Sequence, residues 1–321
     1  MNLDNKDQVE CIPNICEGRD QSKIDQFVGV IKNHQNIDLV HVDSGHAANR
    51  SVFTLIGELP PMLNCLEELY SAAKREINLS RYESNHPFIG AIDVCPFVAV
   101  KKTQEDLLIR EIKIWARKLS DTLKIPICFY AKSSLQSPLR TLPQIRKGGY
   151  QKLVVEQNVS PNSIDLGSEF LDTDFGISVV GVRDFMVAYN VNLETQDLRK
   201  ARRIASEMRR IREEKGIFAG ISIQDLQIKA WYVEEYNCCQ ITTNIHDTRN
   251  VSPWFVFSFS KEIALQFGVK VKSSELIGML PKHSQRLLSN ELNTEEPKEI
   301  SKILGLGFNG PFNVESRFLP V

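Results

Sequence analysis

The sequence has almost no net charge and no long apolar run. Its 321 residues carry 39 Lys and Arg against 40 Asp and Glu, a formal net charge of -1. This balance provides no global field that would draw the chain to nucleic acid or to an anionic membrane, so we expect neither as a partner. No uncharged apolar run approaches the roughly 20 residues that a membrane-spanning helix needs. The first ten residues are polar and acidic and lack the regions of a secretory signal, so we expect a cytoplasmic protein.

Several chemical motifs are also missing. The seven cysteines form no CxxC pair, which fits free thiols in a reducing compartment. The sequence has no GxxxxGK[ST] phosphate-binding loop and no GxSxG serine elbow. His41, Asp43 and His46 lie close together but lack the spacing of a zinc site, so we expect no metal ion. Cys95 lies in an apolar run, where a small buried residue is a better interpretation than a nucleophile.

The first hundred residues alternate between strand and helix patterns. Apolar and alternating runs predict strands at 9–13, 39–43, 50–57 and 93–100. Apolar residues at helical spacing predict one helix after the first of these strands and another after the third. The resulting order, β-α-β-β-α-β, is the split βαβ arrangement.

The second half of the chain repeats this order. Strand patterns occur at 185–193, 226–235, 239–245 and 269–272, with helical patterns after the first and the third. We therefore expect an α+β fold of two ferredoxin-like (βαββαβ) subdomains with a ligand cleft between them.

The subdomains are expected to comprise residues 1–178 and 179–321. Towards the end of the first, from 132 to 176, the regular pattern fades, and Arg140, Arg146, Lys147 and Lys152 make this stretch the most basic near the centre of the chain. A long stretch of this kind in a compact protein is usually functional or a linker. We interpret it as a connecting and binding segment, with a solvated linker as the alternative.

His86 lies where a predicted helix gives way to a predicted strand. Pro87 fixes its own φ and pushes His86 towards an extended backbone, so the imidazole leaves a stiffened turn. Gly90 and Ala91 leave room for a substrate or another backbone to approach. An imidazole with its ordinary pKa of about 6.5 can give and take a proton near neutral pH. We predict that His86 is catalytic, and the alternative is a histidine packed in an ordinary turn.

Two further charged residues are candidates for the same site. Asp43 ends a predicted strand and could orient the imidazole of His86 or bind a substrate amine, but it could equally be a turn or cap residue. Arg50 could hold a carboxylate through its planar guanidinium, or pair with a structural partner.

A series of short motifs follows along the chain. They lie at residues 9–14, 17–18, 42–45, 49–54, 86–87, 90–91, 93–97, 141–143, 145–146 and 188–193. In this order they resemble the formiminotransferase domain of the formimidoyltransferase-cyclodeaminase family, over nearly the whole chain.

The resemblance implies transfer of the formimino group from N-formimino-L-glutamate to tetrahydrofolate, which gives 5-formiminotetrahydrofolate and L-glutamate in histidine degradation. It also implies tetrahydrofolate as a co-substrate, a homodimer, and His86 as the proton donor. The segment that it implies for folate binding consists of Gly167, Ser168, Glu169, Phe170, Leu171, Asp172, Thr173, Asp174, Phe175 and Gly176.

The chain departs from the family pattern at positions where ligands should lie. Phe88 stands where the family usually has an arginine, and Ala131 and Lys132 stand where it has a glycine and an acid. These differences favour an alternative function, a catalytically weakened folate-binding or interaction protein of the same fold.

Overall fold

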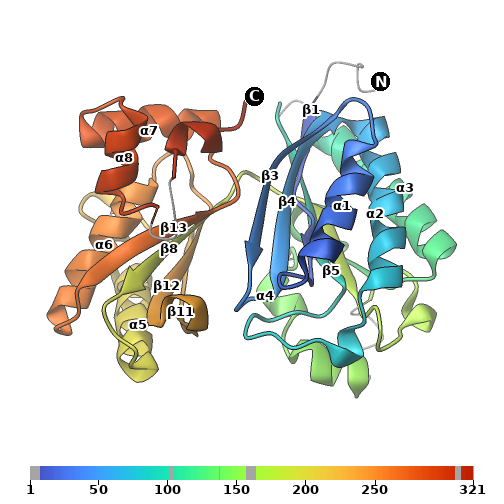
Figure 1. Cartoon of the computed structure of the whole chain (residues 1–321), viewed down its shortest axis with the longest axis horizontal. Coiled ribbons are helices and arrows are strands. Elements are labelled where there is room, and N and C mark those ends of the chain that lie inside the picture. Colours follow the sequence, from blue (N-terminus) through green and yellow to red (C-terminus); the bar gives the residue numbers. More distant parts are fainter. Residues whose placement is uncertain (1–7, 102–103, 137, 157–163, 308–311, 321) are drawn as a thin grey trace. The chain divides into compact units, whose positions relative to one another are not determined.

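Two compact units, Met1–Asp184 and Phe185–Val321, make up the fold (Figure 1). The computed structural model describes residues 8–101, 104–136, 138–156, 164–307 and 312–320. The expected boundary between residues 178 and 179 falls inside strand β7 (Ser178–Val182). The division comes a few residues later because β7 pairs with β5 and β6 of the first unit.

The first unit is built on a seven-stranded mixed sheet. Its elements are β1 (Gln8–Cys11), β2 (Asn14–Ile15), α1 (Gln21–Lys32), β3 (Ile37–Gly45), β4 (Arg50–Glu58), α2 (Leu59–Glu76), β5 (Ile92–Ala99), α3 (Glu105–Leu123), β6 (Ile127–Phe129), α4 (Leu142–Ile145) and β7. Strands β1 and β2 both lie between β4 and β5 and pair antiparallel with each. The order β3-β4-β1-β5 is consistent with the predicted split βαβ unit, which β7 and β6 extend in parallel to β5.

Local sequence explains how the helices of this unit begin. The side chain of Asp20 accepts the backbone N–H groups of Ser22 and Lys23 and so caps α1, as predicted. Prolines occupy the first turn of α2, where a missing N–H leaves no bond unmade. The buried face of α1 consists of the apolar residues Ile24, Phe27 and Ile31.

The two faces of the first sheet are packed differently. Phe27, Tyr70 and Trp115, from helices α1, α2 and α3, belong to the main core on one face. On the other face, the segment 142–155 packs through Ile145 and other apolar residues against β5, β6 and β7. This part of the chain is therefore packed against the sheet and is not a solvated linker.

The second unit has a four-stranded antiparallel sheet in the order β11-β12-β8-β13. Its elements are β8 (Val187–Leu193), α5 (Leu198–Lys215), β9 (Ile217–Phe218), β10 (Ile221–Ser222), β11 (Leu226–Val233), β12 (Cys238–Ile245), α6 (Pro253–Gln266), β13 (Val271–Ile277), α7 (Lys282–Leu292) and α8 (Pro297–Ile303). Helices α5 and α6 share one core with the apolar side of the sheet. This order is again consistent with the predicted βαββαβ unit.

Strand β13 differs from its prediction. The sequence predicted residues 269–272, whereas the strand runs from Val271 to Ile277. Ser273, Ser274 and Glu275 interrupt the apolar pattern, so the strand pairs through its backbone where the side chains gave no signal.

Candidate functional site

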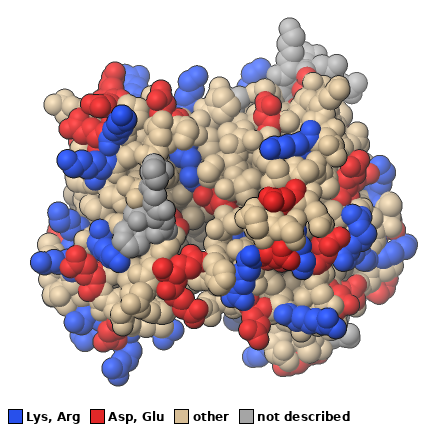
Figure 2. All heavy atoms as spheres, viewed as in Figure 1, with Lys and Arg blue, Asp and Glu red and all other residues tan. Residues whose placement is uncertain are grey.

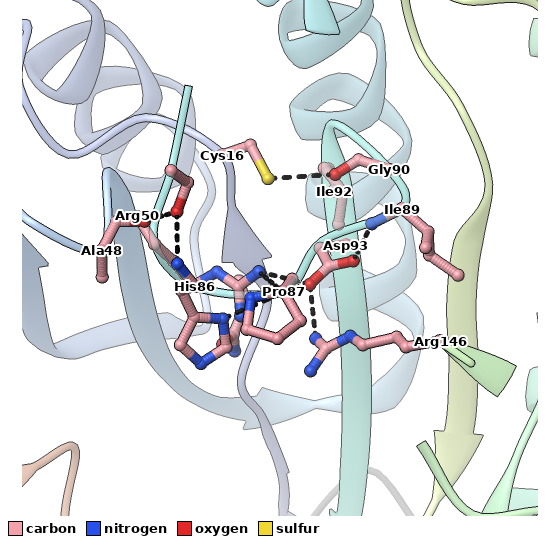
Figure 3. Close-up of polar contacts among 12 residues, drawn as sticks. Cys16, Ala48, Arg50, His86, Pro87, Ile89, Gly90, Ile92, Asp93 and Arg146 are labelled. Atoms are coloured by element: carbon pink, nitrogen blue, oxygen red, sulfur yellow. Dashed lines mark hydrogen bonds and ion pairs between the residues drawn. The ribbon is translucent and has the colours of Figure 1, made fainter. Parts of the chain in front are cut away.

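His86 lies on the turn that leads into β5, and its side chain is partly exposed (Figure 3). Its backbone N–H donates to Ser84 Oγ at 2.9 Å, and its Nδ1 lies 2.9 Å from the Pro87 carbonyl oxygen. Because a carbonyl only accepts, this contact assigns the proton of the neutral ring to Nδ1. Nε2 is then the nitrogen that can take up and release a proton.

The turn is tied to the loop between β3 and β4. Ser84 Oγ donates to the Ala48 carbonyl at 2.6 Å, and Asn49 Nδ2 donates to the Glu83 carbonyl at 3.0 Å. Asn49 Oδ1 accepts the backbone N–H of Gly18 at 3.0 Å, so one side chain links three segments. These bonds fix the backbone on both sides of the imidazole.

Asp93 is the charged centre of the site and is fully buried. Its Oδ1 accepts the backbone N–H of Ile89 at 2.8 Å, and its Oδ2 bonds both Arg50 Nη2 and Arg146 Nη2 (Figure 3). Arg50 Nη2 also donates to the Pro87 carbonyl at 3.0 Å, the same oxygen that lies beside His86 Nδ1. Two guanidinium groups share one carboxylate, which leaves an excess of one positive charge beside the imidazole.

The two arginines respond differently to their surroundings. Burial is the largest single effect at Arg50 and disfavours its charged form, but Asp93, Cys16 and Tyr82 together outweigh burial and raise the Arg50 pKa. Burial is the stronger effect at Arg146 and lowers its pKa despite Asp93. The Nε atoms of both side chains are buried and have no hydrogen-bond partner among the described residues.

The run from Gly167 to Gly176 starts beside the end of α3 and ends beside the His86 turn. Its first part, a 3₁₀ turn at Ser168–Phe170, places Phe170 under Lys124 just after α3, with Nζ 4.7 Å from the ring centre. Its last part pairs with the turn, because the Phe175 carbonyl accepts the N–H of Ala91 at 2.8 Å. Asp172 Oδ1 accepts the N–H groups of Asp174 and Phe175 and shapes this end.

Two glycines allow this close pairing. A Cβ on Gly90 would lie 2.2 Å from the Ile177 carbonyl oxygen, and one on Gly176 would lie 2.2 Å from the Ile89 carbonyl oxygen. The sequence predicted that a substrate or another backbone could approach Gly90, and in the structure the backbone of Ile177 does so. The absence of a side chain at Gly90 therefore allows the turn to pack against the segment that enters β7.

Phe88, the residue that replaces an expected arginine, is held in an aromatic cluster. Its ring makes an edge contact with Tyr82, with ring centres 4.7 Å apart, and stacks on Tyr150 at 5.2 Å. Tyr150 OH donates to the Thr173 carbonyl at 2.6 Å. The cluster thus joins the turn, the central segment and the run that ends at Gly176.

The other sequence candidates have separate surroundings. Asp43 Oδ1 lies 3.0 Å from His41 Nε2 on β3, and the expected orientation of His86 by Asp43 stays a prediction. Lys132 Nζ pairs with Glu105 at 2.5 Å and with Asp184 at 2.6 Å. Cys95 is fully buried, with its sulfur 3.6 Å from that of Cys11, so it is not placed to act as a nucleophile.

Sequence reasoning found His86 and Arg50 but did not predict that Asp93 and Arg146 join them. A charged residue inside the otherwise apolar pattern of β5 was the signal that could have identified Asp93, because a buried charge needs a partner. Among the residues that the structure describes, no three His, Cys, Asp or Glu side chains gather as a metal site.

None of the helices in the described part of the chain combines the length and the apolar character needed to cross a bilayer. On the face seen in Figure 2, Lys and Arg side chains are interspersed with Asp and Glu.

Known proteins share this sequence pattern. Residues 8–183 match the family model described as formiminotransferase domain, N-terminal subdomain, and residues 188–294 match the model described as formiminotransferase domain. The chain is 32% identical to formimidoyltransferase-cyclodeaminase of Dictyostelium discoideum, over 85% of this chain and 50% of that protein. It is 30% identical to glutamate formimidoyltransferase of Streptococcus pyogenes serotype M1, over 85% of this chain and 89% of that protein.

The share of each relative's length that the chain covers differs from one relative to another. The chain spans about half the length of formimidoyltransferase-cyclodeaminases such as those of Dictyostelium discoideum and Sus scrofa, at 50% of each. Among solved structures, the periplasmic protease PqqL from Escherichia coli aligns with a TM-score of 0.21 at 9% identity, over 82% of this chain and 34% of that one. So low a score supports no argument about the fold.

Proposed function

The chain belongs to the formiminotransferase family, and from this premise we propose that it transfers the formimino group of N-formimino-L-glutamate to tetrahydrofolate. The products would be 5-formiminotetrahydrofolate and L-glutamate, in histidine degradation. The observation that carries the proposal is the partly exposed imidazole of His86, braced at Nδ1 by the Pro87 carbonyl and next to an excess positive charge.

The chemistry needs a proton carrier of this kind. Attack of folate N5 on the formimino carbon gives a tetrahedral intermediate, which cannot expel glutamate until the glutamate nitrogen is protonated. His86 Nε2 can accept the proton released from N5 and return it to the leaving nitrogen. General acid–base catalysis of this type contributes roughly 10²–10⁴-fold to a rate.

The charge of the site suits the substrates. Formiminoglutamate carries two carboxylates, and tetrahydrofolate carries a glutamate tail. Arg50 and Arg146 share one negative partner, and their buried Nε donors are unpaired among the described residues. A carboxylate held here would complete the charge balance.

Other parts of the proposal rest on the family. We propose that the run from Gly167 to Gly176 binds folate, that tetrahydrofolate is a co-substrate, and that the protein is a cytoplasmic homodimer. The pairing of Phe175 and Gly176 with the His86 turn supports the folate assignment, because it couples this segment to the imidazole. The expected roles of Asp43 and of a ligand cleft remain predictions.

Replacing His86 with Ala tests the mechanism. Turnover of formiminoglutamate with tetrahydrofolate should fall about 10²–10⁴-fold, because the variant lacks the imidazole that we propose as the proton carrier, with a smaller change in KM. The matched control is His34→Ala, since His34 follows α1 and pairs with Glu68 at 3.3 Å. Equal turnover in the wild type and His86→Ala would remove His86 from the mechanism.

The alternative is a catalytically weakened folate-binding or interaction protein of the same fold. The observation that favours it is Phe88, whose ring is packed between two tyrosines and offers no charge to a substrate. Calorimetric titration with tetrahydrofolate separates the two functions. Heat of binding, without formimino transfer when formiminoglutamate and tetrahydrofolate are supplied together, would favour the binding protein.

A further inference from the structure

The end of the proposed folate segment is held by three different parts of the first unit. Three consecutive carbonyl oxygens there each accept one hydrogen bond. The Phe175 carbonyl accepts a backbone N–H of the His86 turn at 2.8 Å, and the Asp174 carbonyl accepts the N–H of Leu79 at 2.9 Å. The Thr173 carbonyl accepts the hydroxyl of Tyr150 at 2.6 Å. Of these three bonds, only the one from Tyr150 is made by a side chain.

The residues held in this way are the exposed part of the segment. Asp172, Thr173 and Asp174 are exposed, whereas Phe175 is buried. A ligand that binds at this end of the segment therefore meets residues 172–174. The position of their backbone depends on the bond from Tyr150, because the hydroxyl fixes the carbonyl in the middle of the stretch.

Tyr150 is itself held against the His86 turn. Its ring stacks on that of Phe88, with ring centres 5.2 Å apart and planes inclined by 25°. Four residues earlier in the chain, Arg146 bonds the buried carboxylate of Asp93. The short segment from 146 to 150 thus contacts the turn through Tyr150 and the start of β5 through Arg146. The hydroxyl of Tyr150 connects this fixed segment to the proposed folate segment.

The hydroxyl of Tyr150 keeps its proton near neutral pH. Burial, together with the carboxylates of Asp174 and Asp172, raises the pKa of Tyr150 above its ordinary value. A carbonyl oxygen only accepts, so the protonated hydroxyl is the donor of the bond to Thr173. Replacing tyrosine with phenylalanine at this position removes that donor and leaves the aromatic ring.

We propose that Tyr150 is a positioning residue that sets the affinity for tetrahydrofolate, acting through the backbone of the proposed folate segment. The inference rests on the proposed function, which assigns this segment to folate. The hydroxyl contacts the segment and not the imidazole of His86, so its loss should leave the binding of formiminoglutamate unchanged. Phe88 has a part in this arrangement, because the stack that orients the ring of Tyr150 needs an aromatic partner.

Two variants of the full chain separate the hydroxyl from the ring. Tyr150→Phe removes the bond to Thr173 and keeps the stack on Phe88, whereas Tyr150→Leu removes both. The matched control is Tyr232→Phe in the second unit, where the lost hydroxyl donates to Asn237 Oδ1, also at 2.6 Å. Thermal unfolding confirms that each variant is folded.

Tetrahydrofolate and formiminoglutamate are titrated separately by calorimetry. Tyr150→Phe should weaken the binding of tetrahydrofolate about three- to tenfold, which corresponds to the loss of one hydrogen bond, and Tyr150→Leu should weaken it further. Both variants should bind formiminoglutamate as the wild type does, and Tyr232→Phe should bind both probes normally. In turnover by Tyr150→Phe, KM for tetrahydrofolate should rise while kcat stays nearly constant. A purely structural role would not separate the two substrates.

Hydrogen exchange measures the position of the segment without any ligand. The backbone N–H groups of Leu79 and Ala91 bond the two carbonyls that follow Thr173. Both should exchange faster in Tyr150→Phe than in the wild type or in Tyr232→Phe, because the neighbouring bond that restrains the segment is lost. Unchanged exchange at both groups, or a Tyr150→Phe variant that binds tetrahydrofolate as tightly as the wild type, would overturn the positioning role.

The outcome for the transferase is read independently. If the wild type binds tetrahydrofolate without formimino transfer and Tyr150→Phe weakens that binding, the positioning role stands and the transferase proposal fails. If turnover is present and Tyr150→Phe leaves KM for tetrahydrofolate unchanged, the transferase stands and the positioning role fails. A wild type that does not bind tetrahydrofolate at all would overturn both.

Discussion

Asp93 connects the His86 turn to two buried arginines. One buried carboxylate holds the backbone of Ile89 and the guanidinium groups of Arg50 and Arg146. Arg50 passes this constraint on to the Pro87 carbonyl and so to the imidazole. Asp93 is therefore a positioning residue, which acts on His86 through Arg50.

Asp93→Asn should damage both stability and turnover. It leaves two buried guanidinium groups without an anionic partner, which should lower the free energy of unfolding by about 3–5 kcal/mol. Turnover should fall about tenfold or more, because the turn is no longer held in place. Urea unfolding measures the free energy of unfolding, and an assay of formimino transfer from formiminoglutamate to tetrahydrofolate measures turnover. Asp25→Asn, at an exposed site on α1, should change neither, and an Asp93→Asn variant equally unaffected would refute the positioning role.

At the scale of the elements, the contact between the His86 turn and the segment entering β7 leaves no room for a side chain at two glycines. The two backbones meet at Gly90 and Gly176, where the Ile177 N–H donates to the Ile89 carbonyl at 2.7 Å. Adding even one carbon atom at either glycine would force the strands apart. The end of the proposed folate segment is thus packed directly against the turn that carries His86.

Gly90→Ala should lower the free energy of unfolding by about 1–3 kcal/mol, because its Cβ would overlap a backbone oxygen that cannot rotate away. The control is Gly29→Ala within α1, where nothing lies within 4 Å of the added Cβ. That substitution should be neutral or stabilise the helix by up to about 1 kcal/mol. Equal melting temperatures for Gly90→Ala and the wild type would contradict the close approach.

At the scale of the whole molecule, the stability of the fold depends on pH through one buried acid, Glu10. Burial raises its pKa from 4.5 to about 7, an effect that the charge of Arg183 partly opposes. The folded state therefore holds the Glu10 proton more tightly than the unfolded state does. The contribution of Glu10 is most favourable below pH 4.5 and is lost as the pH rises towards about 7.

Glu10→Gln should remove this dependence. The free energy of unfolding of the wild type should fall by roughly 3 kcal/mol relative to the variant between pH 4.5 and 7.5, because glutamine carries no ionisable proton. Urea unfolding at closely spaced pH values measures the difference. Parallel pH profiles for the two proteins would show that Glu10 ionises freely in the folded state.

The sequence predicted the elements better than the site. Helix α1 followed from the Asp20 cap and the spacing of its apolar residues, and His86 was identified by the proline after it. A hydrogen-bond network on the second sheet was not predicted, because its members on β8, β11, β12 and β13 are mostly polar and look like an ordinary solvated face. Only strand pairing shows that Asn190 and Glu275, 85 residues apart, lie side by side.

By itself, the sequence determined the order of helices and strands and the stiff turn at His86. These depend on periodicity, caps and prolines, which act over a few residues. Tertiary structure alone decided which charges meet. Asp93 bonds Arg50 and Arg146, 43 and 53 residues away, and that depends on how strands pair and how loops pack at their ends. A charged residue in an apolar strand pattern indicates that a partner is needed, but which residue is the partner is decided only when the chain has folded.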